Sequence, residues 1–293
     1  QQLGMAPDTL QSLRTAGFLD RQAAEWKLTR TCEAVPLVNL LPNALRAELH
    51  ARVADWLLGV HETAEGAGSA AHAERLARIA LHLVLADRLR DAVRLLQSHE
   101  AAADHAPRAW SRCLQAVLKD ERLDTTTRCE MLLLAARTER TAGRAREALT
   151  LIQTVPTHEA PPTIRARVEA ETGACHAALG HASEAERCLQ AALEDATDAA
   201  LRTVVLEHLA RSLLHRGAYE QARSTCHLAR ETGQAVPELL CLEAMACSYL
   251  GHAEQAWSLV QKSKQLLATT GRPRTHVRAI TTLALHDLRE GNL

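Results

Sequence analysis

The stretch Ala136–Ala148, ARTERTAGRAREA, decides the fold, because its pattern recurs as GACHAALGHASEA at 173–185, ARSLLHRGAYEQA at 210–222 and AMACSYLGHAEQA at 244–256. Each copy has a glycine at its eighth position and a small residue at its first and last positions. The glycines stand 37, 37 and 34 residues apart. A fixed period of this size predicts a solenoid of stacked helical hairpins.

Physical reasons support this interpretation of the repeated glycine. Two helices approach closely only where their side chains are small, and a chain reverses within two or three residues only where a residue accepts a positive φ. Gly291 continues the series 40 residues after Gly251, and Asp87 takes the glycine position of an earlier hairpin. We therefore expect the last alanine of each copy to be buried at a hairpin contact: Ala148, Ala185, Ala222 and Ala256.

The apolar spacing after residue 42 predicts helices almost throughout the chain. A first helix at 43–60 carries an apolar stripe that comprises Leu45, Leu49, Val53, Trp56 and Leu57. The glycine-containing stretch 61–70 predicts a linker. We expect a right-handed superhelical array over 71–293, without strands and irregular at 98–124, with helices at 72–86, 88–105, 107–119, 124–142, 145–154, 163–179, 182–195, 199–215, 219–232, 236–250, 253–269 and 273–290.

The front of the chain, 1–62, predicts a small winged-helix-like module followed by the connecting helix. Asp8 caps a short predicted helix that Gly17 ends. The segments 18–20 and 25–29 are short and β-prone, which predicts a hairpin across 21–24. Within 8–41 the basic and acidic residues balance, four against four, so we expect this module not to bind DNA.

Composition excludes several classes of protein. The 293 residues carry a net charge of −1, which argues against nucleic acid as a direct partner, and only 2% are aromatic, so bases would find few stacking surfaces. No run of eighteen apolar residues predicts a membrane span, and no secretory signal opens the chain. Eight cysteines without a C-x-x-C pair indicate buried free thiols in a cytoplasmic protein. The first residue is not Met and the last ones form half a hairpin, so we expect a piece of a longer protein.

The paired small residues around each turn glycine resemble the tetratricopeptide repeat (TPR) family. The matching pairs are Ala136/Ala148, Gly173/Ala185, Ala210/Ala222 and Ala244/Ala256. The resemblance implies an all-α, tetratricopeptide-like solenoid, well matched over 130–293 and more loosely over 72–100. The aromatic residues usual in the first helix of the family are replaced here by Leu, Ala or Cys.

A second resemblance covers the N-terminal part. The string TLQSLRTAGFL at 9–19, the string LPNALRAELH at 41–50 and Ala80-Leu81-His82 look like the stretch that follows the nucleotide-binding domain in large signalling ATPases of the STAND class. These include MalT-like and large LuxR-type transcription regulators of bacteria. The resemblance implies a sensor region, with an ATPase domain upstream in the same chain. No G-x-x-x-x-G-K-[ST] occurs in these 293 residues, so we expect no catalysis by this segment.

A metal site is a more specific but less favoured interpretation of the histidines and cysteines. The densest group comprises Cys175, His176, His181 and Cys188, and thiolate with imidazole suits zinc. Adjacent residues on a helix point about 100° apart, however, so Cys175 and His176 cannot face one metal ion easily. The pair Cys226-His227 and the pair His99/His105 are weaker. We therefore predict no metal and no cofactor.

The concave side of the array is the preferred candidate site. In a tetratricopeptide-like superhelix the first helix of each hairpin lines this side. Counting back from the turn glycines places Glu130, Leu133, Ala170, Ala174, Val204, Cys241, Ser248 and Thr281 there, together with the residues that we select as binding candidates: Arg137, Arg140, Arg167, Glu207, Arg211, His215, Met245, Tyr249 and Arg278. The four arginines at 137, 140, 167 and 211 form a predicted basic strip that suits carboxylate or phosphate partners. The alternative is that each arginine pairs along its own helix, as Arg211 can with Glu207.

Three functions remain open from the sequence. The first is a non-catalytic sensor region of a bacterial signalling ATPase, most plausibly a transcription regulator, that binds a protein, a peptide with an acidic segment, or a small effector. The second is a constitutive TPR scaffold that docks a partner protein, for example in a fused kinase or cyclase. The third, a metal- or thiol-dependent enzyme, is the least favoured.

Overall fold

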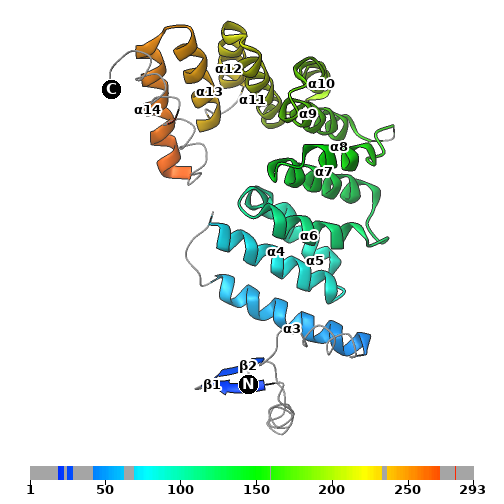
Figure 1. Ribbon diagram of the computed structural model, residues 1–293. Coiled ribbons are helices and arrows are strands. Elements are labelled where there is room, and N and C mark those ends of the chain that lie inside the picture. Colours follow the sequence, from blue (N-terminus) through cyan, green and yellow to red (C-terminus); the bar gives the residue numbers. More distant parts are fainter. Residues whose placement is uncertain are drawn as a thin grey trace. The chain divides into compact units, whose positions relative to one another are not determined.

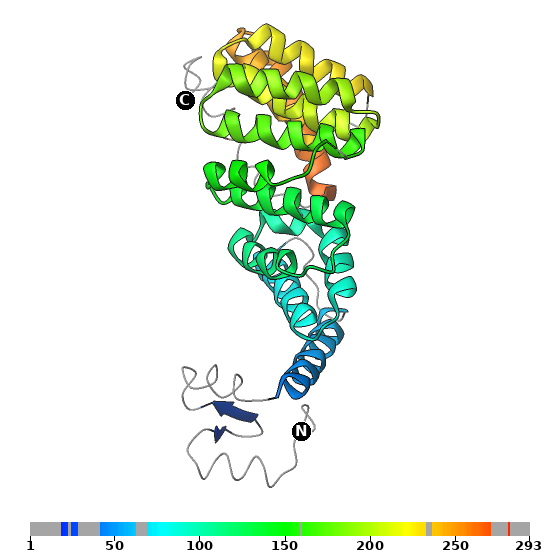
Figure 2. The same ribbon diagram turned by 90° about the vertical axis from the view of Figure 1, so that its right-hand side faces the viewer.

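The computed structural model describes residues 19–22, 25–28, 42–62, 69–158, 160–232, 236–270 and 281 (Figures 1 and 2). The chain divides into two compact units, 1–119 and 120–293, which are treated separately below. The helices predicted at 8–16 and 273–290 lie outside the described residues, apart from Thr281, which is helical. The domain limits 1–62 and 71–293 remain predictions.

The first unit begins with a two-stranded antiparallel hairpin. Strand β1 (Leu19–Gln22) pairs with β2 (Glu25–Leu28), with Leu19 opposite Leu28 and Gln22 opposite Glu25. These strands coincide with the predicted hairpin, but the remainder of the predicted winged-helix-like module lies outside the described residues.

The described helices of the first unit follow the predicted order. They are α3 (Asn43–Glu62), α4 (Ala70–Leu85), α5 (Leu89–Ser98), the 3₁₀ helix η1 (Glu100–Asp104) and α6 (Pro107–Leu118). Helix α4 lies at the centre and packs against α3, α5 and α6. Trp110 of α6 is fully buried and donates a hydrogen bond from Nε1 to the carbonyl oxygen of Ala73, 3.1 Å away. This bond ties α6 to the start of α4.

Two sequence predictions need correction in this unit. The predicted continuous helix at 88–105 ends at Ser98, where Ser98 Oγ and the His99 ring interact with carbonyl oxygens of the preceding turn instead of leaving them to the helix. The predicted stripe of α3 is only partly the contact face, since Leu45 and Trp56 are exposed. Leu57 of the stripe is buried together with the small Ala54, which lies outside the stripe, so the buried side of α3 is offset from the predicted one.

The second unit contains four helical hairpins among its described residues. Their bounds are α7 (Thr125–Thr141) and α8 (Ala145–Gln153), α9 (Pro162–Ala178) and α10 (Ala182–Asp195), α11 (Ala199–Arg216) and α12 (Tyr219–Thr232), and α13 (Pro237–Tyr249) and α14 (Ala253–Thr270). Each helix pair packs extensively along its length (Figure 1). No strand occurs among the described residues after 71, in agreement with the prediction.

The turn glycines have the predicted conformation. Gly143, Gly180, Gly217 and Gly251 have φ between 79° and 84°. Asp87 has φ 62°, so the aspartate does occupy the glycine position of the first hairpin. After Gly217, the backbone N–H of Ala218 bonds to the carbonyl of Leu213 at 2.9 Å, which is the helix-ending bond of a Schellman motif. Equivalent bonds close the other turns.

The small residues of the repeat are buried where the helices of a hairpin meet. The four predicted alanines are all at most 2% exposed: Ala148, Ala185, Ala222 and Ala256. The contact is closest in the second hairpin, where a Cβ added at Gly173 would stand 2.7 Å from Cγ of Leu189 and 3.0 Å from the carbonyl oxygen of Ala185. This burial confirms the predicted register.

The first helices of successive hairpins form one layer of the second unit, which we call the inner face. Helix α7 contacts α9, α9 contacts α11, and α11 contacts α13. No comparable contact joins α8, α10, α12 and α14 to one another among the described residues. Side chains of the inner face therefore lie beside the side chains of neighbouring hairpins.

The cysteines and the helices agree with two compositional predictions. Seven of the eight cysteines are described, and all seven are buried free thiols. None of the described helices combines the length and the apolar character that crossing a membrane requires.

Candidate partner-binding site

The inner face of the second unit carries charged residues on three successive hairpins. Arg137 and Arg140 stand one turn apart on α7, and Glu207, His208 and Arg211 lie within two turns of α11. Glu171 belongs to α9, which lies between them. We call these six residues the arginine cluster. Asp124 and Asp198 cap the N-termini of α7 and α11, because their side chains accept hydrogen bonds from backbone N–H groups of the first helical turn.

The ion pair between Arg140 and Glu171 joins the first hairpin of the unit to the second. Nε and Nη2 of Arg140 each lie 3.0 Å from Oε2 of Glu171, and both side chains are about 85% buried, with 13% and 15% exposed. Burial opposes the charge of Arg140, but the charge of Glu171 and its hydrogen bond outweigh burial and raise the pKa of Arg140. Arg140 therefore stays charged, and the ion pair fixes the position of its guanidinium.

Arg211 forms its ion pair within its own helix. Its Nη2 donates to Oε1 of Glu207 at 2.5 Å, one turn earlier on α11. This is the i, i+4 pairing that the sequence left open as the alternative to a basic strip. The Nε of Arg211 is buried and has no hydrogen-bond partner among the described residues. One donor of this guanidinium thus remains available to an acceptor.

The positive charges of three arginines act on His208. Its pKa is held well below 6.5, first by burial and then by the guanidinium groups of Arg140, Arg211 and Arg137. The histidine is therefore neutral at pH 7. The three guanidinium groups of the cluster offer donors of the kind that bind carboxylate or phosphate groups.

Glu171 and His208 were not among the predicted site residues, although the repeat contains a signal for them. Both precede their turn glycine by nine residues, Gly180 and Gly217 respectively. Arg137 and Arg211 likewise share the sixth position before their glycines. Equivalent positions lie in register on stacked hairpins, so aligning the repeats by their glycines would have placed these residues beside one another.

The other predicted candidates do not join the arginine cluster. Arg167 is partly exposed on α9 and takes part in neither of the two ion pairs described above. His215 is exposed near the end of α11, and Met245 packs against the core between α11 and α13. Arg278 lies outside the described residues. Four residues that the count from the glycines placed on the groove surface are buried instead, because they pack between helices: Leu133, Ala170, Ala174 and Cys241.

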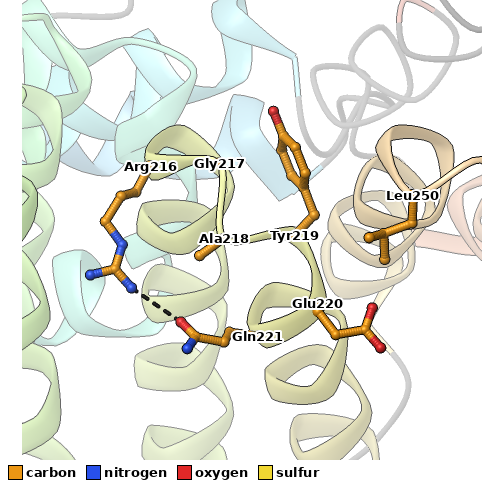
Figure 3. A pocket seen from close by; sticks show the side chains of 7 residues that line it. All are labelled: Arg216, Gly217, Ala218, Tyr219, Glu220, Gln221 and Leu250. Atoms are coloured by element: carbon orange, nitrogen blue, oxygen red, sulfur yellow. Dashed lines mark hydrogen bonds between the residues drawn. The ribbon is translucent and has the colours of Figure 1, made fainter.

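Tyr249 belongs to a different surface, at the turn end of the third and fourth hairpins. Its ring stacks on Tyr219 with centroids 4.4 Å apart and an interplanar angle of 8°. Tyr219 also lines an open pocket of about 450 Å³, together with residues of the α11–α12 turn and Leu250 (Figure 3). Arg216 at its edge is held by Glu186 at 3.0 Å and by Gln221 at 3.1 Å.

The zinc alternative finds no support in the described residues, where no group of three or more potential ligands converges. His176 and His181 do come together, with 3.3 Å between their Nδ1 atoms. Burial, reinforced by the charge of Glu171, raises the pKa of the Cys175 thiol to about 12. A protonated, buried thiol is a poor metal ligand.

Comparison with known proteins identifies the fold. No protein-family model matches the chain, and no curated protein matches it. Among solved structures, a signal transduction ATPase with numerous domains (STAND) from Pyrococcus horikoshii, a protein with a tetratricopeptide repeat sensor, is similar over 98% of this chain with 14% identity and a TM-score of 0.59. The chain spans 44% of the length of that protein.

Two further solved structures are similar at lower scores. A tetratricopeptide repeat protein from Parabacteroides merdae matches 85% of this chain and 98% of its own length, with 10% identity and a TM-score of 0.44. BtubC from P. vanneervenii matches 74% of this chain and 92% of its own length, with 16% identity and a TM-score of 0.47. The stacked helical hairpins of the described residues and the similarity at a TM-score of 0.59 together show a TPR-like helical solenoid fold.

Proposed function

We propose that this chain is the partner-binding sensor region of a multidomain signalling ATPase. The observation that carries the proposal is the fold similarity over 98% of the chain to a STAND protein with a TPR sensor, of which the chain spans only 44%. The LPNALRAELH and Ala80-Leu81-His82 segments, which resemble the region after the ATPase domain, point to the same class.

The parent protein in this proposal is a bacterial, cytoplasmic transcription regulator with its ATPase domain upstream. The segment itself is non-catalytic. Its buried thiols are protonated, as for Cys113 and Cys175, both with a pKa of about 12, and are therefore poor nucleophiles.

The partner binds on the inner face of α7, α9 and α11 in this proposal. The arginine cluster offers three positively charged guanidinium groups, and the buried Nε of Arg211 has no hydrogen-bond partner among the described residues. A partner with an acidic segment complements that charge and fixes its own register through guanidinium–carboxylate bonds. Duplex nucleic acid is a poor fit, because a net charge of −1 lacks the basic surplus that is typical of proteins that bind it.

Affinity capture with matched variants tests this proposal. Tagged wild-type chain captures partners from lysate of the source organism, and the variant Arg137→Ala/Arg211→Ala is expected to lose them while keeping its helical circular dichroism. The control Arg94→Ala/Arg146→Ala removes the same charge from exposed positions of α5 and α8 and should capture normally. If the cluster variant retains every partner with native affinity, the inner face is not the binding surface.

The alternative is a constitutive scaffold that docks a partner without sensing. Restoring the chain to its full-length parent separates the two functions. In a sensor, partner addition changes the rate of nucleotide hydrolysis, and the Arg137→Ala/Arg211→Ala variant loses this response. In a scaffold, the partner binds but the hydrolysis rate does not change.

A further inference from the structure

We propose that the outer side of α3 is the contact surface of a homodimer, in which the α3 helices of two copies pack antiparallel about a two-fold axis. The partner is therefore a second copy of this chain. The outer side is defined by Leu45, Leu49, Arg52 and Trp56. The inference goes beyond the proposed function and does not depend on it, because α3 belongs to the first unit and the arginine cluster to the second.

Helix α3 carries its apolar residues on two opposite sides. One side packs against α4: Ala54 is fully buried, and four residues earlier Nδ1 of His50 lies 2.8 Å from Nδ1 of His82 in α4. Leu45 stands nine positions before Ala54 and Trp56 two positions after it, so a turn of about 100° per residue places both on the opposite side. Among the described elements, α4 is the only one that packs extensively against α3 (Figure 1).

The outer side leaves large apolar side chains in contact with solvent. Leu45 is 43% exposed and Trp56 is 49% exposed, and Leu49 between them is half-buried. Together they form a stripe about 16 Å long, at a rise of about 1.5 Å per residue. A helix that is apolar on all sides is normally covered on all sides, and large apolar side chains gathered on a surface mark an interaction site. The outer side of α3 therefore has the character of an interface.

The order of residues along this stripe fits a second copy of itself in reverse. The midpoint between Leu45 and Trp56 lies between positions 50 and 51. When two α3 helices pack antiparallel about this point, Leu45 of each copy faces Trp56 of the other, so a smaller side chain meets a larger one at both ends. Such an interface is isologous, and two-fold dimers are the commonest assemblies of soluble proteins.

The flanks of the stripe are complementary in the same arrangement, because a two-fold axis perpendicular to the helices brings the same flank of both copies together. Glu48 and Arg52 share one flank and form an ion pair at 2.6 Å within each copy. Arg52 of one copy is level with Glu48 of the other to within one residue, about 1.5 Å, so the two ion pairs join into one network. On the opposite flank Leu49 and Val53 are level in the same way, so apolar side chains meet there.

Sedimentation velocity of the full 293-residue chain tests the dimer. The expected result is a shift from the 32.0 kDa monomer to a dimer as the concentration rises through the micromolar range, because one helix pair makes a small interface. Trp56→Lys places a charge in the stripe and should leave only the monomer. Trp257→Lys is the matched control, because Trp257 of α14 is equally exposed, at 50%, but lies outside the surface. This control should dimerise like the wild type, and circular dichroism checks that both variants remain folded.

Charge reversal tests the antiparallel arrangement. Glu48→Arg gives a copy with two positive charges on the flank, and Arg52→Glu gives a copy with two negative charges. Each variant alone should associate at least about tenfold more weakly than the wild type, because like charges then meet across the axis. An equimolar mixture of the two variants should recover the dimer, because each cation of one copy then meets a carboxylate of the other.

Three results would overturn the inference. The first is a monomer at every concentration, which would mean that another part of the chain or a different protein covers the outer side of α3. The second is undiminished dimerisation of Trp56→Lys, or an equal loss in Trp257→Lys, which would place the contact elsewhere or make it non-specific. The third is a mixture of the charge-reversed variants that does not recover the dimer. None of these results bears on the inner face, whose test is partner capture by the Arg137→Ala/Arg211→Ala variant.

Discussion

Substituting Gly173 by alanine tests the closest helix contact in the chain. The added Cβ would meet Cγ of Leu189 at 2.7 Å and the carbonyl oxygen of Ala185 at 3.0 Å. Both neighbours belong to α10, and Leu189 is fully buried, so neither can move freely into solvent. We expect Gly173→Ala to push α9 away from α10 and to destabilise the second unit.

The magnitude follows from two opposing effects. Alanine is favoured over glycine inside a helix by about 1 kcal/mol, whereas overpacking a close contact costs about 1–3 kcal/mol. The net loss for Gly173→Ala is therefore between about 0 and 2 kcal/mol. Gly59 of α3 is the matched control, because it is helical and exposed and an added Cβ meets nothing within 4 Å. Gly59→Ala should stabilise by about 1 kcal/mol.

Urea unfolding followed by circular dichroism measures both variants against the wild type, and hydrogen exchange in α9 and α10 localises the effect. The two variants should differ by about 1–3 kcal/mol in free energy of unfolding. Leu189→Ala should lower the free energy of unfolding less in the Gly173→Ala background than in the wild type, because it removes the atom with which the added Cβ clashes. Equal stabilisation by Gly173→Ala and Gly59→Ala would refute the proposed contact.

Three further predictions concern titratable and charged side chains. His50 and His82 share a hydrogen bond of 2.8 Å between their Nδ1 atoms, and the pKa of each is lowered, first by burial. The unfolded chain thus binds more protons below about pH 6.5, so stability should fall as the pH drops from 7.5 to 5.5, and His82→Gln should reduce this fall in urea titrations. The thiol of Cys113, its pKa raised to about 12 by burial, should resist iodoacetamide at pH 8 until guanidinium chloride unfolds the chain; modification of the native protein, detected by mass spectrometry, would contradict this. Arg230→Leu should cost about 3 kcal/mol because it leaves the carboxylate of Glu243 buried without its cation, and Arg230→Leu/Glu243→Leu should recover much of that loss in thermal melts, whereas additive losses would argue against the pair.

The sequence by itself determined the repeat architecture. Local requirements were sufficient for this, because a turn with positive φ selects glycine, or Asp87 in one case, and a close helix contact selects alanine. Both requirements concern residues within about forty positions of one another, so they leave a regular spacing of glycine and alanine in the sequence. The helix bounds therefore follow the pattern to within one or two residues in most of the described chain.

The break at His99 was not predictable from apolar periodicity. The pattern of 88–105 fits a continuous helix, but Ser98 and His99 direct their side chains to carbonyl groups of the preceding turn. In the same way, the apolar stripe of α3 did not reveal that small Ala54 would lie at the contact with α4. Which of several apolar faces is used depends on the partner helix, not on the helix itself.

The composition of the candidate site was decided by the tertiary structure. The sequence indicated that Arg137, Arg140 and Arg211 lie at similar depths on the inner face, but it did not assign Glu171 to Arg140 or place His208 in their field. The Arg140–Glu171 ion pair depends on a distance of a few ångströms between side chains 31 residues apart in the chain. The stacking of α7, α9 and α11 determines such distances. The spacing along the sequence determines only which positions of successive hairpins lie beside one another.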